Sequence, residues 1–209
     1  EDLSPRALRI LRSVGLIAAE DTRHTLQLLT HFDVHTRLIS YHEHNKLSRL
    51  DQVLDALQAG DVALVSDAGT PALNDPGYEL VRAALQAGFP VSPVPGPSAP
   101  IAALVASGLP TDTFLYLGYL PRKAGERQRL LDQVRTLPYT LIFLESPHRL
   151  LDALHDLQQG LGDRQVAVAR ELTKLYEEIF RGSLRQAAEY FTAHSPKGEF
   201  TLVIAGQTS

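Results

Sequence analysis

Residues 63–77 read Ala-Leu-Val-Ser-Asp-Ala-Gly-Thr-Pro-Ala-Leu-Asn-Asp-Pro-Gly, a pattern that predicts a strand, an irregular loop and a helix. The apolar start is typical of a short buried strand in a parallel sheet. Asp75 and Pro76 predict the N-cap and the first residue of the helix. In open α/β sheets such a loop lies at the carboxyl end of the strand, where ligands bind. Gly69 has no side chain and lets the backbone approach a ligand, although an ordinary βα turn has the same pattern.

The first half of the chain repeats this alternation. Short apolar runs predict further strands at residues 16–19, 37–41 and 91–94. Apolar residues at helical spacing separate them, with Ser4-Pro5 and Asn45 as expected helix starts. Four alternations of strand and helix predict a parallel sheet with helices on both faces.

The second half contains more strands than helices. Residues 109–113 interrupt the alternation, which places the predicted boundary between an N-terminal α/β domain, residues 1–110, and a C-terminal α/β domain, residues 111–209. Helices are expected over 130–134, after Ser146-Pro147 and after Ser183. Because strands predominate, a mixed sheet is expected, with strands at 114–119, 140–144, 165–169, 176–180 and 200–204 and a hairpin around Thr173-Lys174.

Composition limits the classes of function. The 209 residues include 44% hydrophobic side chains, enough for one large core or two small ones. The chain contains no cysteine, which excludes disulfides and cysteine-based metal sites. Without an apolar run of 18 residues or a signal-peptide pattern, no membrane association is expected, and a cytoplasmic location fits. The net charge of −4 is not typical of a nucleic-acid-binding domain.

Two local clusters of polar residues stand out. Residues 122–129 carry four basic side chains, which indicate either the solvated start of a helix or contacts to RNA phosphates. Five histidines lie between His24 and His44, but no pair has the i, i+4 spacing on a clear helix face that metal binding favours. We therefore expect no metal site, because scattered loop histidines are usually solvated.

A set of short motifs, in order along nearly the whole chain, resembles the tetrapyrrole methylase superfamily. The two carrying most weight are Ser66-Asp-Ala-Gly-Thr-Pro71 and Val94-Pro-Gly-Pro-Ser-Ala99. Within that superfamily the chain resembles the small-subunit (16S) ribosomal RNA cytidine-2′-O-methyltransferase I family. The motifs that carry this closer resemblance are Ala19-Glu-Asp-Thr-Arg23, Ser40-Tyr-His-Glu-His-Asn45, Leu144-Glu-Ser-Pro-His-Arg149, Ala169-Arg-Glu-Leu-Thr-Lys174 and Lys197-Gly-Glu-Phe200.

The resemblance implies a two-domain α/β, tetrapyrrole-methylase-like fold with S-adenosylmethionine held in the cleft between the domains. It implies cofactor contacts made largely by backbone, which suits small or polar residues. A G-x-G-x-x-G dinucleotide fingerprint is missing, which disfavours a nicotinamide cofactor. The expected cofactor-binding residues are Ser66, Asp67, Ala68, Gly69, Thr70, Pro97, Ser98, Ala99 and Leu144.

The implied reaction is methyl transfer to the ribose 2′-hydroxyl of a cytidine, which needs in-line alignment and benefits from a positioned base. The resemblance also implies 16S ribosomal RNA or the 30S subunit as partner and a homodimer. Candidate catalytic residues at predicted strand ends are Glu145, His148, Glu171 and Lys174, with Glu199 as a further candidate. Expected substrate-binding residues are Arg23, His42, His44, Arg122, Lys123, Arg127, Arg149 and Arg170, together with Arg129 from the basic run. An exposed salt bridge of little energetic value is the alternative for each of these charged residues.

Two other functions fit the same fold: a tetrapyrrole or diphthamide methylase, or a non-catalytic protein that binds RNA or a ligand. Members of the family begin with an apolar strand and a loop rich in proline and glycine, just before the segment that matches Glu1-Asp2. That strand lies inside the first sheet of the family. Two explanations are open. Either the segment exists outside residues 1–209, or the sheet rearranges and pairs its exposed edge elsewhere, such as with another chain, because a lost interior strand leaves unpaired backbone on its neighbours.

Overall fold

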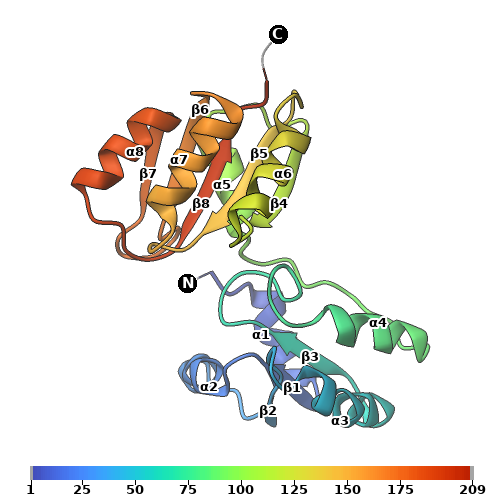
Figure 1. Cartoon of the computed structure of the whole chain (residues 1–209). Coiled ribbons are helices and arrows are strands. Elements are labelled where there is room, and N and C mark those ends of the chain that lie inside the picture. Colours follow the sequence, from blue (N-terminus) through green and yellow to red (C-terminus); the bar gives the residue numbers. More distant parts are fainter. Residues whose placement is uncertain (1, 208–209) are drawn as a thin grey trace. The chain divides into compact units, whose positions relative to one another are not determined.

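The computed structural model describes residues 2–207, which form two compact units, one ending at Ser98 and one beginning at Ala99 (Figure 1). This division differs from the expected boundary at residues 109–113. Helix α5 (Ala99–Ser107) contacts strands of the second unit's sheet and therefore belongs to that unit.

The first unit alternates helix and strand around a small parallel sheet. Its strands β1, β2 and β3 have the order β2-β1-β3, and both pairings are parallel, as the alternation predicts. The elements are α1 (Pro5–Ser13), β1 (Leu16–Ala19), α2 (Thr22–His31), β2 (Leu38–Ser40), α3 (Lys46–Ala59), β3 (Val62–Val65) and α4 (Tyr78–Gln86).

Helices cover both faces of this sheet because side chains of a strand alternate between its faces. Ile17 and Ala19 of β1 pack in one apolar cluster with residues of α1 and α2. Leu16 and Ala18 pack in a second cluster with residues of α3 and α4. The doubly wound arrangement predicted for the first half is therefore confirmed.

Two expectations about this sheet are wrong. Residues 91–94 are not a strand, and within residues 2–207 they pair with no strand, so that nothing holds them in a ladder. β3 is parallel but not buried: all four of its residues are partly exposed. Among the described residues β3 pairs only with β1, so its other edge is open.

The helix starts of this unit agree with the sequence in part. The side chain of Ser4 accepts a hydrogen bond from the Ala7 amide and caps α1, as predicted. The expected start at Asp75-Pro76 is wrong: α4 begins at Tyr78, with Gly77 as N-cap. Gly77 has φ of 147°, which is incompatible with a helix, so the chain stays irregular up to that residue.

The second unit contains a five-stranded mixed sheet of order β4-β5-β8-β6-β7. β4 and β5 are parallel, whereas β8 is antiparallel to both β5 and β6, and β6 is antiparallel to β7. Besides α5, the elements are β4 (Phe114–Tyr119), α6 (Ala124–Val134), β5 (Thr140–Glu145), α7 (Leu150–Leu161), β6 (Gln165–Arg170), β7 (Glu178–Ser183), α8 (Leu184–Ala193) and β8 (Phe200–Ile204). The predicted mixed sheet and the hairpin between β6 and β7 are confirmed.

Helices α6, α7 and α8 cover one face of this sheet, and α5 covers the other (Figure 1). Leu141 and Phe143 face the three-helix layer, and Ile142 between them faces α5. Of the helices between residues 2 and 207, none combines the length and apolar character that crossing a bilayer requires.

In the second unit, one predicted helix start is correct and another is wrong. Ser183 caps α8 through a reciprocal pair of hydrogen bonds with Gln186, a complete capping box. The expected start at Ser146-Pro147 is wrong, because α7 begins at Leu150. Residues 146–149 instead form a turn, in which the Arg149 amide donates to the Ser146 carbonyl oxygen.

Candidate functional site

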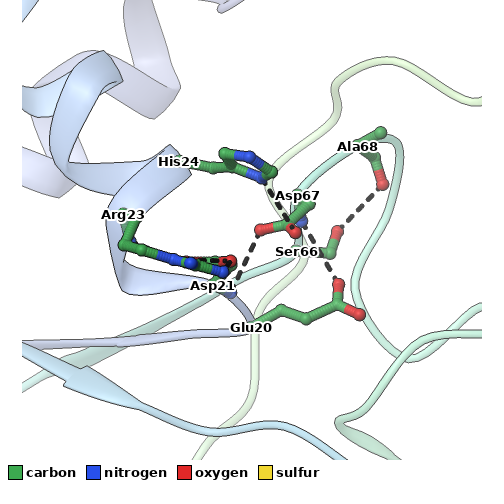
Figure 2. A network of polar contacts seen from close by, with 7 residues as sticks. All are labelled: Glu20, Asp21, Arg23, His24, Ser66, Asp67 and Ala68. Carbon is green, nitrogen blue, oxygen red and sulfur yellow. Dashed lines mark hydrogen bonds and ion pairs between the residues drawn. The ribbon is translucent and has the colours of Figure 1, made fainter.

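The loops after the three strands of the first unit meet at one edge of its sheet, because all three strands run in the same direction. Asp67, after β3, lies at the start of α2, which follows β1 (Figure 2). Its carboxylate accepts a hydrogen bond from the Asp21 amide at 3.1 Å and contacts Nδ1 of His24 at 3.2 Å. Its own amide donates to the Glu20 carboxylate at 3.3 Å. Asp67 therefore fixes its loop against the adjacent strand end.

Asp21 is the N-cap of α2, because its carboxylate accepts a hydrogen bond from the Arg23 amide at 2.8 Å. The Arg23 guanidinium also binds this carboxylate at 2.6 Å, and these hydrogen bonds hold the pKa of Asp21 far below its ordinary value. The Arg23 side chain is 85% exposed and remains accessible to a ligand from outside.

His24, one of the five histidines expected to be solvated, lies in this cluster beside Asp67. Asp21, His24 and Asp67 each offer one possible metal-ligating atom, and these atoms lie within 4.8 Å of one another. The i, i+3 spacing of Asp21 and His24 at a helix start was the available signal, but Asp67 is distant in sequence. The Arg23 guanidinium already binds the Asp21 carboxylate, so this cluster carries its own countercharge.

The two loops expected to bind the cofactor contact each other. The Thr70 hydroxyl donates to the Pro97 carbonyl oxygen at 3.1 Å. Gly69 has φ of 72°, and a Cβ placed there would meet nothing within 4 Å. Ala72 and Asn74 also have positive φ, so this loop holds a conformation that few L-residues adopt.

Several residues of these two loops are exposed, as a surface that binds a cofactor requires. Asp67, Ala68, Gly69 and Thr70 are all exposed, and Ser66 is partly buried with its hydroxyl donating to the Ala68 carbonyl oxygen. On the second loop Pro97 is exposed and Ser98 is partly buried. In the second unit, Ala99 begins α5 and Leu144 is a partly buried residue of β5.

His42 and His44 follow β2 at the same edge of the first sheet. Their ring centroids lie 6.1 Å apart in an edge-on arrangement. Asn45 stands at the N-cap of α3, as expected, but its side chain makes no capping bond. Its Oδ1 accepts from the His42 amide, and its Nδ2 donates to Ser40. Asn45 therefore stabilises the histidine-containing turn rather than the helix.

In the second unit, Glu145 lies at the end of β5 with its side chain fully buried. One carboxylate oxygen accepts from the Ser146 amide at 2.8 Å, and the other lies 3.4 Å from the Arg149 guanidinium. Burial raises the pKa of Glu145 above its ordinary value. Arg149 also donates to the Leu120 carbonyl oxygen at 2.7 Å. Glu145 and Arg149 thus connect the end of β5 to the loop after β4.

Glu171, Lys174 and Glu199 form an ion-pair cluster at the same edge of the second sheet. The Lys174 ammonium lies 3.0 Å from a carboxylate oxygen of each glutamate. Burial lowers the pKa of Lys174, but hydrogen bonds to Glu199 and Glu171 outweigh it, and the pKa is raised overall. The hydrogen bond from Lys174 lowers the pKa of Glu171. Lys174 is therefore held as a cation and is poorly suited to act as a base.

Some of the remaining candidate side chains are bound by other groups of the protein, and others are exposed. Arg170 binds the Lys197 carbonyl oxygen and Glu178, and His148 is exposed. Arg127 binds Asp156 at 2.6 Å and donates to two loop carbonyls, so its charge is committed. The exposed members of the basic run are Arg122, Lys123 and Arg129.

Comparison with known families places the chain among methyltransferases. The profile of the Tetrapyrrole (Corrin/Porphyrin) Methylases matches residues 1–188. The ribosomal RNA small subunit methyltransferase I of Synechocystis sp. is 54% identical over 209 residues, with 99% of this chain and 75% of the relative aligned. The protein of the same name from Escherichia coli O157:H7 is 48% identical, with coverages of 98% and 73%.

Solved structures share the fold at low sequence identity. A diphthine synthase matches with a TM-score of 0.77 at 14% identity, covering 99% of this chain and 85% of its own. A cobalt precorrin-4 methyltransferase matches with a TM-score of 0.70 at 16% identity, with coverages of 98% and 89%. These likenesses support the fold and, at such identities, say nothing about the substrate.

Proposed function

The chain belongs to the tetrapyrrole methylase family and to its ribosomal RNA small subunit methyltransferase I branch, and from this we propose that it transfers a methyl group from S-adenosylmethionine to RNA. The acceptor is the ribose 2′-hydroxyl of a cytidine in small-subunit ribosomal RNA. The observation that carries the proposal is the identity of about half of all residues with relatives of that name along the whole chain.

The residues proposed to hold the cofactor are those of the two contacting loops in the first unit, together with Ala99 and Leu144. Their support is the open backbone around Gly69 and the hydrogen bond from Thr70 to Pro97. The bound sulfonium supplies an electrophilic methyl group. The protein's contribution is to hold the acceptor hydroxyl in line and to exclude other geometries.

A neutral 2′-hydroxyl needs a proton acceptor, and the candidates are not equivalent. Glu145 is enclosed and bound by the Ser146 amide, so we propose that it orients Arg149 rather than meeting substrate. Lys174 is held protonated between two carboxylates. His148 is exposed and Glu199 is 72% exposed at its side chain, so these two are the proposed proton acceptors.

The proposed partners are 16S ribosomal RNA, as free RNA or within the 30S subunit, and a second copy of the chain, in the cytoplasm. Arg23, His42, His44, Arg149, Arg170 and the exposed basic residues Arg122, Lys123 and Arg129 are the proposed RNA contacts. Arg127, also expected from the sequence, is instead bound to Asp156. Light scattering tests the dimer: a mass near 22.9 kDa, that of one chain, counts against it.

The test of the reaction uses methyl-labelled S-adenosylmethionine and small-subunit RNA, followed by digestion to nucleosides. Label in 2′-O-methylcytidine is the expected result. Label in a base, or in another nucleoside, contradicts the proposed acceptor. Parallel reactions with a porphyrin precursor and with a protein acceptor test the alternatives that the fold allows, a tetrapyrrole methylase and a diphthamide methylase.

A further inference from the structure

The loop between β6 and β7, residues 171–177, carries two large apolar side chains at its tip. Leu175 is 87% exposed and Tyr176 is 69% exposed, whereas Leu172 in the same loop packs against the core between the sheet and α5. Leu172 therefore packs the loop against the core, while Leu175 and Tyr176 remain exposed to solvent.

Hydrogen bonds and ion pairs hold the loop on both sides of its tip. Lys174 bridges Glu171 and Glu199 at 3.0 Å each, and the Thr173 amide donates to the Glu177 carboxylate at 2.6 Å. The Lys174 and Glu177 amides close two further turns within the loop. These bonds restrain the residues on both sides of Leu175 and Tyr176.

The backbone of the loop is strained. Glu171 has φ of 49° and the β-branched Thr173 has φ of 64°, conformations that such residues rarely adopt. The Glu171 side chain also lies where a Cβ on Gly198 would stand, 2.5 Å from its nearest atoms, so that only glycine fits there. Strain of this kind persists only where surrounding contacts enforce it, and it is concentrated at functional loops.

The loop lies at the edge of the sheet where the candidate residues gather. β5 and β6 are both antiparallel to β8 and so run in the same direction, which places Glu145 and the loop after Arg170 at the same edge. The loop therefore lies at the same edge of the second unit's sheet as Glu145, and it contributes Glu171 and Lys174 to the cluster with Glu199.

We propose that Leu175 and Tyr176 form a stacking platform for one unpaired nucleobase of the RNA substrate. This rests on the proposed function. Aromatic faces on preformed loops bind unstacked bases, and a single aromatic with one aliphatic neighbour matches the size of one base. Two side chains supply far less area than the roughly 800 Å² per partner of a stable protein interface. Four acidic side chains surround the loop and outnumber their two cationic partners, Lys174 and Arg170, so the tip favours an uncharged base over a phosphate.

The experiment measures binding of a single-stranded RNA of about ten nucleotides, carrying one fluorescent 2-aminopurine, to the full chain. Tyr176→Ala is expected to weaken binding by about 5- to 150-fold and to abolish the quenching of the fluorophore, whereas Tyr176→Phe retains both. Because stacking releases no counterions, the dependence of binding on salt keeps its slope in Tyr176→Ala.

Tyr139→Ala is the matched control. Tyr139 is 40% exposed and precedes β5, so it lies at the opposite edge of the same sheet, and its removal leaves binding unchanged. Thermal unfolding of Tyr176→Ala is expected to match that of the parent protein, since the side chain is exposed.

Unchanged RNA affinity in Tyr176→Ala overturns the platform, as does equal weakening by Tyr139→Ala. A lower mass for Tyr176→Ala in light scattering also overturns it, because the tip then contacts a second copy. The binding assay needs no methyl transfer, so its outcome is distinct from the labelling experiment. If the wild-type chain labels no RNA, the proposed function fails on its own result.

Discussion

The two sheets of this protein bury their strands to different degrees. β8 lies between β5 and β6, and all five of its residues are buried. β3 has an equally apolar sequence, Val-Ala-Leu-Val, but pairs only with β1 among residues 2–207, and all four of its residues stay partly exposed. Burial of a strand therefore follows from its neighbours on both sides as well as from its composition.

The candidate site residues of the two units also differ in kind. In the first unit the candidates lie on exposed loops that contact one another, such as Thr70 with Pro97. In the second unit they lie on ion-paired side chains at the edge of a well-packed sheet, such as Lys174 with Glu171. A loop site depends on backbone conformation, whereas an ion-paired site depends on charge.

The largest expected effect comes from removing equivalent leucines in the two sheets. Leu202 of β8 is fully buried, so Leu202→Ala is expected to lower the free energy of unfolding by about 3–5 kcal/mol. Leu64 of β3 is partly buried, and Leu64→Ala is expected to cost about 1–2 kcal/mol. Urea unfolding followed by circular dichroism measures both. Equal losses would show that the open edge of β3 does not weaken its packing.

The next effect tests the loop site of the first unit. Thr70→Arg is expected to weaken S-adenosylmethionine binding by at least about tenfold (about 1.4 kcal/mol), because the long side chain fills the space beside Gly69 and loses the bond to Pro97. Titration calorimetry measures the affinity. Thr30→Arg, on an exposed position of α2, is the control and leaves it unchanged. Unaltered affinity in Thr70→Arg would remove this loop from the cofactor site.

A smaller effect is expected on the pH dependence of stability, where Glu145 and Asp21 have pKa shifts of opposite direction. Burial raises the pKa of Glu145, so the folded protein binds more protons than the unfolded chain, and stability falls as pH rises from the ordinary value of 4.5 through the raised pKa. Glu145→Gln is expected to flatten this fall, since the amide does not ionise. Urea unfolding across that pH range checks it.

Asp21 gives the reverse sign, because hydrogen bonds from Arg23 lower its pKa. The ionised Asp21 carboxylate stabilises the fold at pH values above its ordinary pKa of 3.8, and this stabilisation is lost only as the pH falls toward the lowered pKa. Asp21→Asn therefore changes stability at neutral pH without changing the slope there. A changed slope between about pH 5 and 7 in Asp21→Asn would contradict this assignment.

The smallest effect concerns the basic run. Replacing Arg122 and Lys123 by glutamine is expected to reduce the salt slope of RNA binding by up to about one unit for each phosphate that the protein no longer neutralises. Arg127→Gln mainly lowers stability, because its guanidinium binds Asp156. Arg135→Gln, exposed at the far end of α6, is the control. An unchanged slope in the double variant would show that the run is a solvated helix start.

Short sequence signals at helix starts predicted some of the N-caps correctly. Ser4 and Ser183 cap helices as predicted, since a side-chain oxygen reaches the helix amides within three residues. Asp75-Pro76 and Ser146-Pro147 have equally good cap sequences and start no helix. The backbone conformation of Gly77 prevents a helix from starting at Asp75-Pro76. After Ser146, a turn precedes the helix.

The sequence by itself determined the family, the alternation of strands and helices, and the loops at the strand ends, because these follow from periodicity and from motifs read along the chain. Tertiary structure decided that residues 91–94 form no strand and that β3 pairs only with β1 in the part of the chain that the structure describes, because pairing depends on neighbours distant in sequence. It also decided that Asp67 binds the start of α2 and that Lys174 lies between Glu171 and Glu199. The charge and reach of such groups depend on partners that only folding brings within hydrogen-bonding distance.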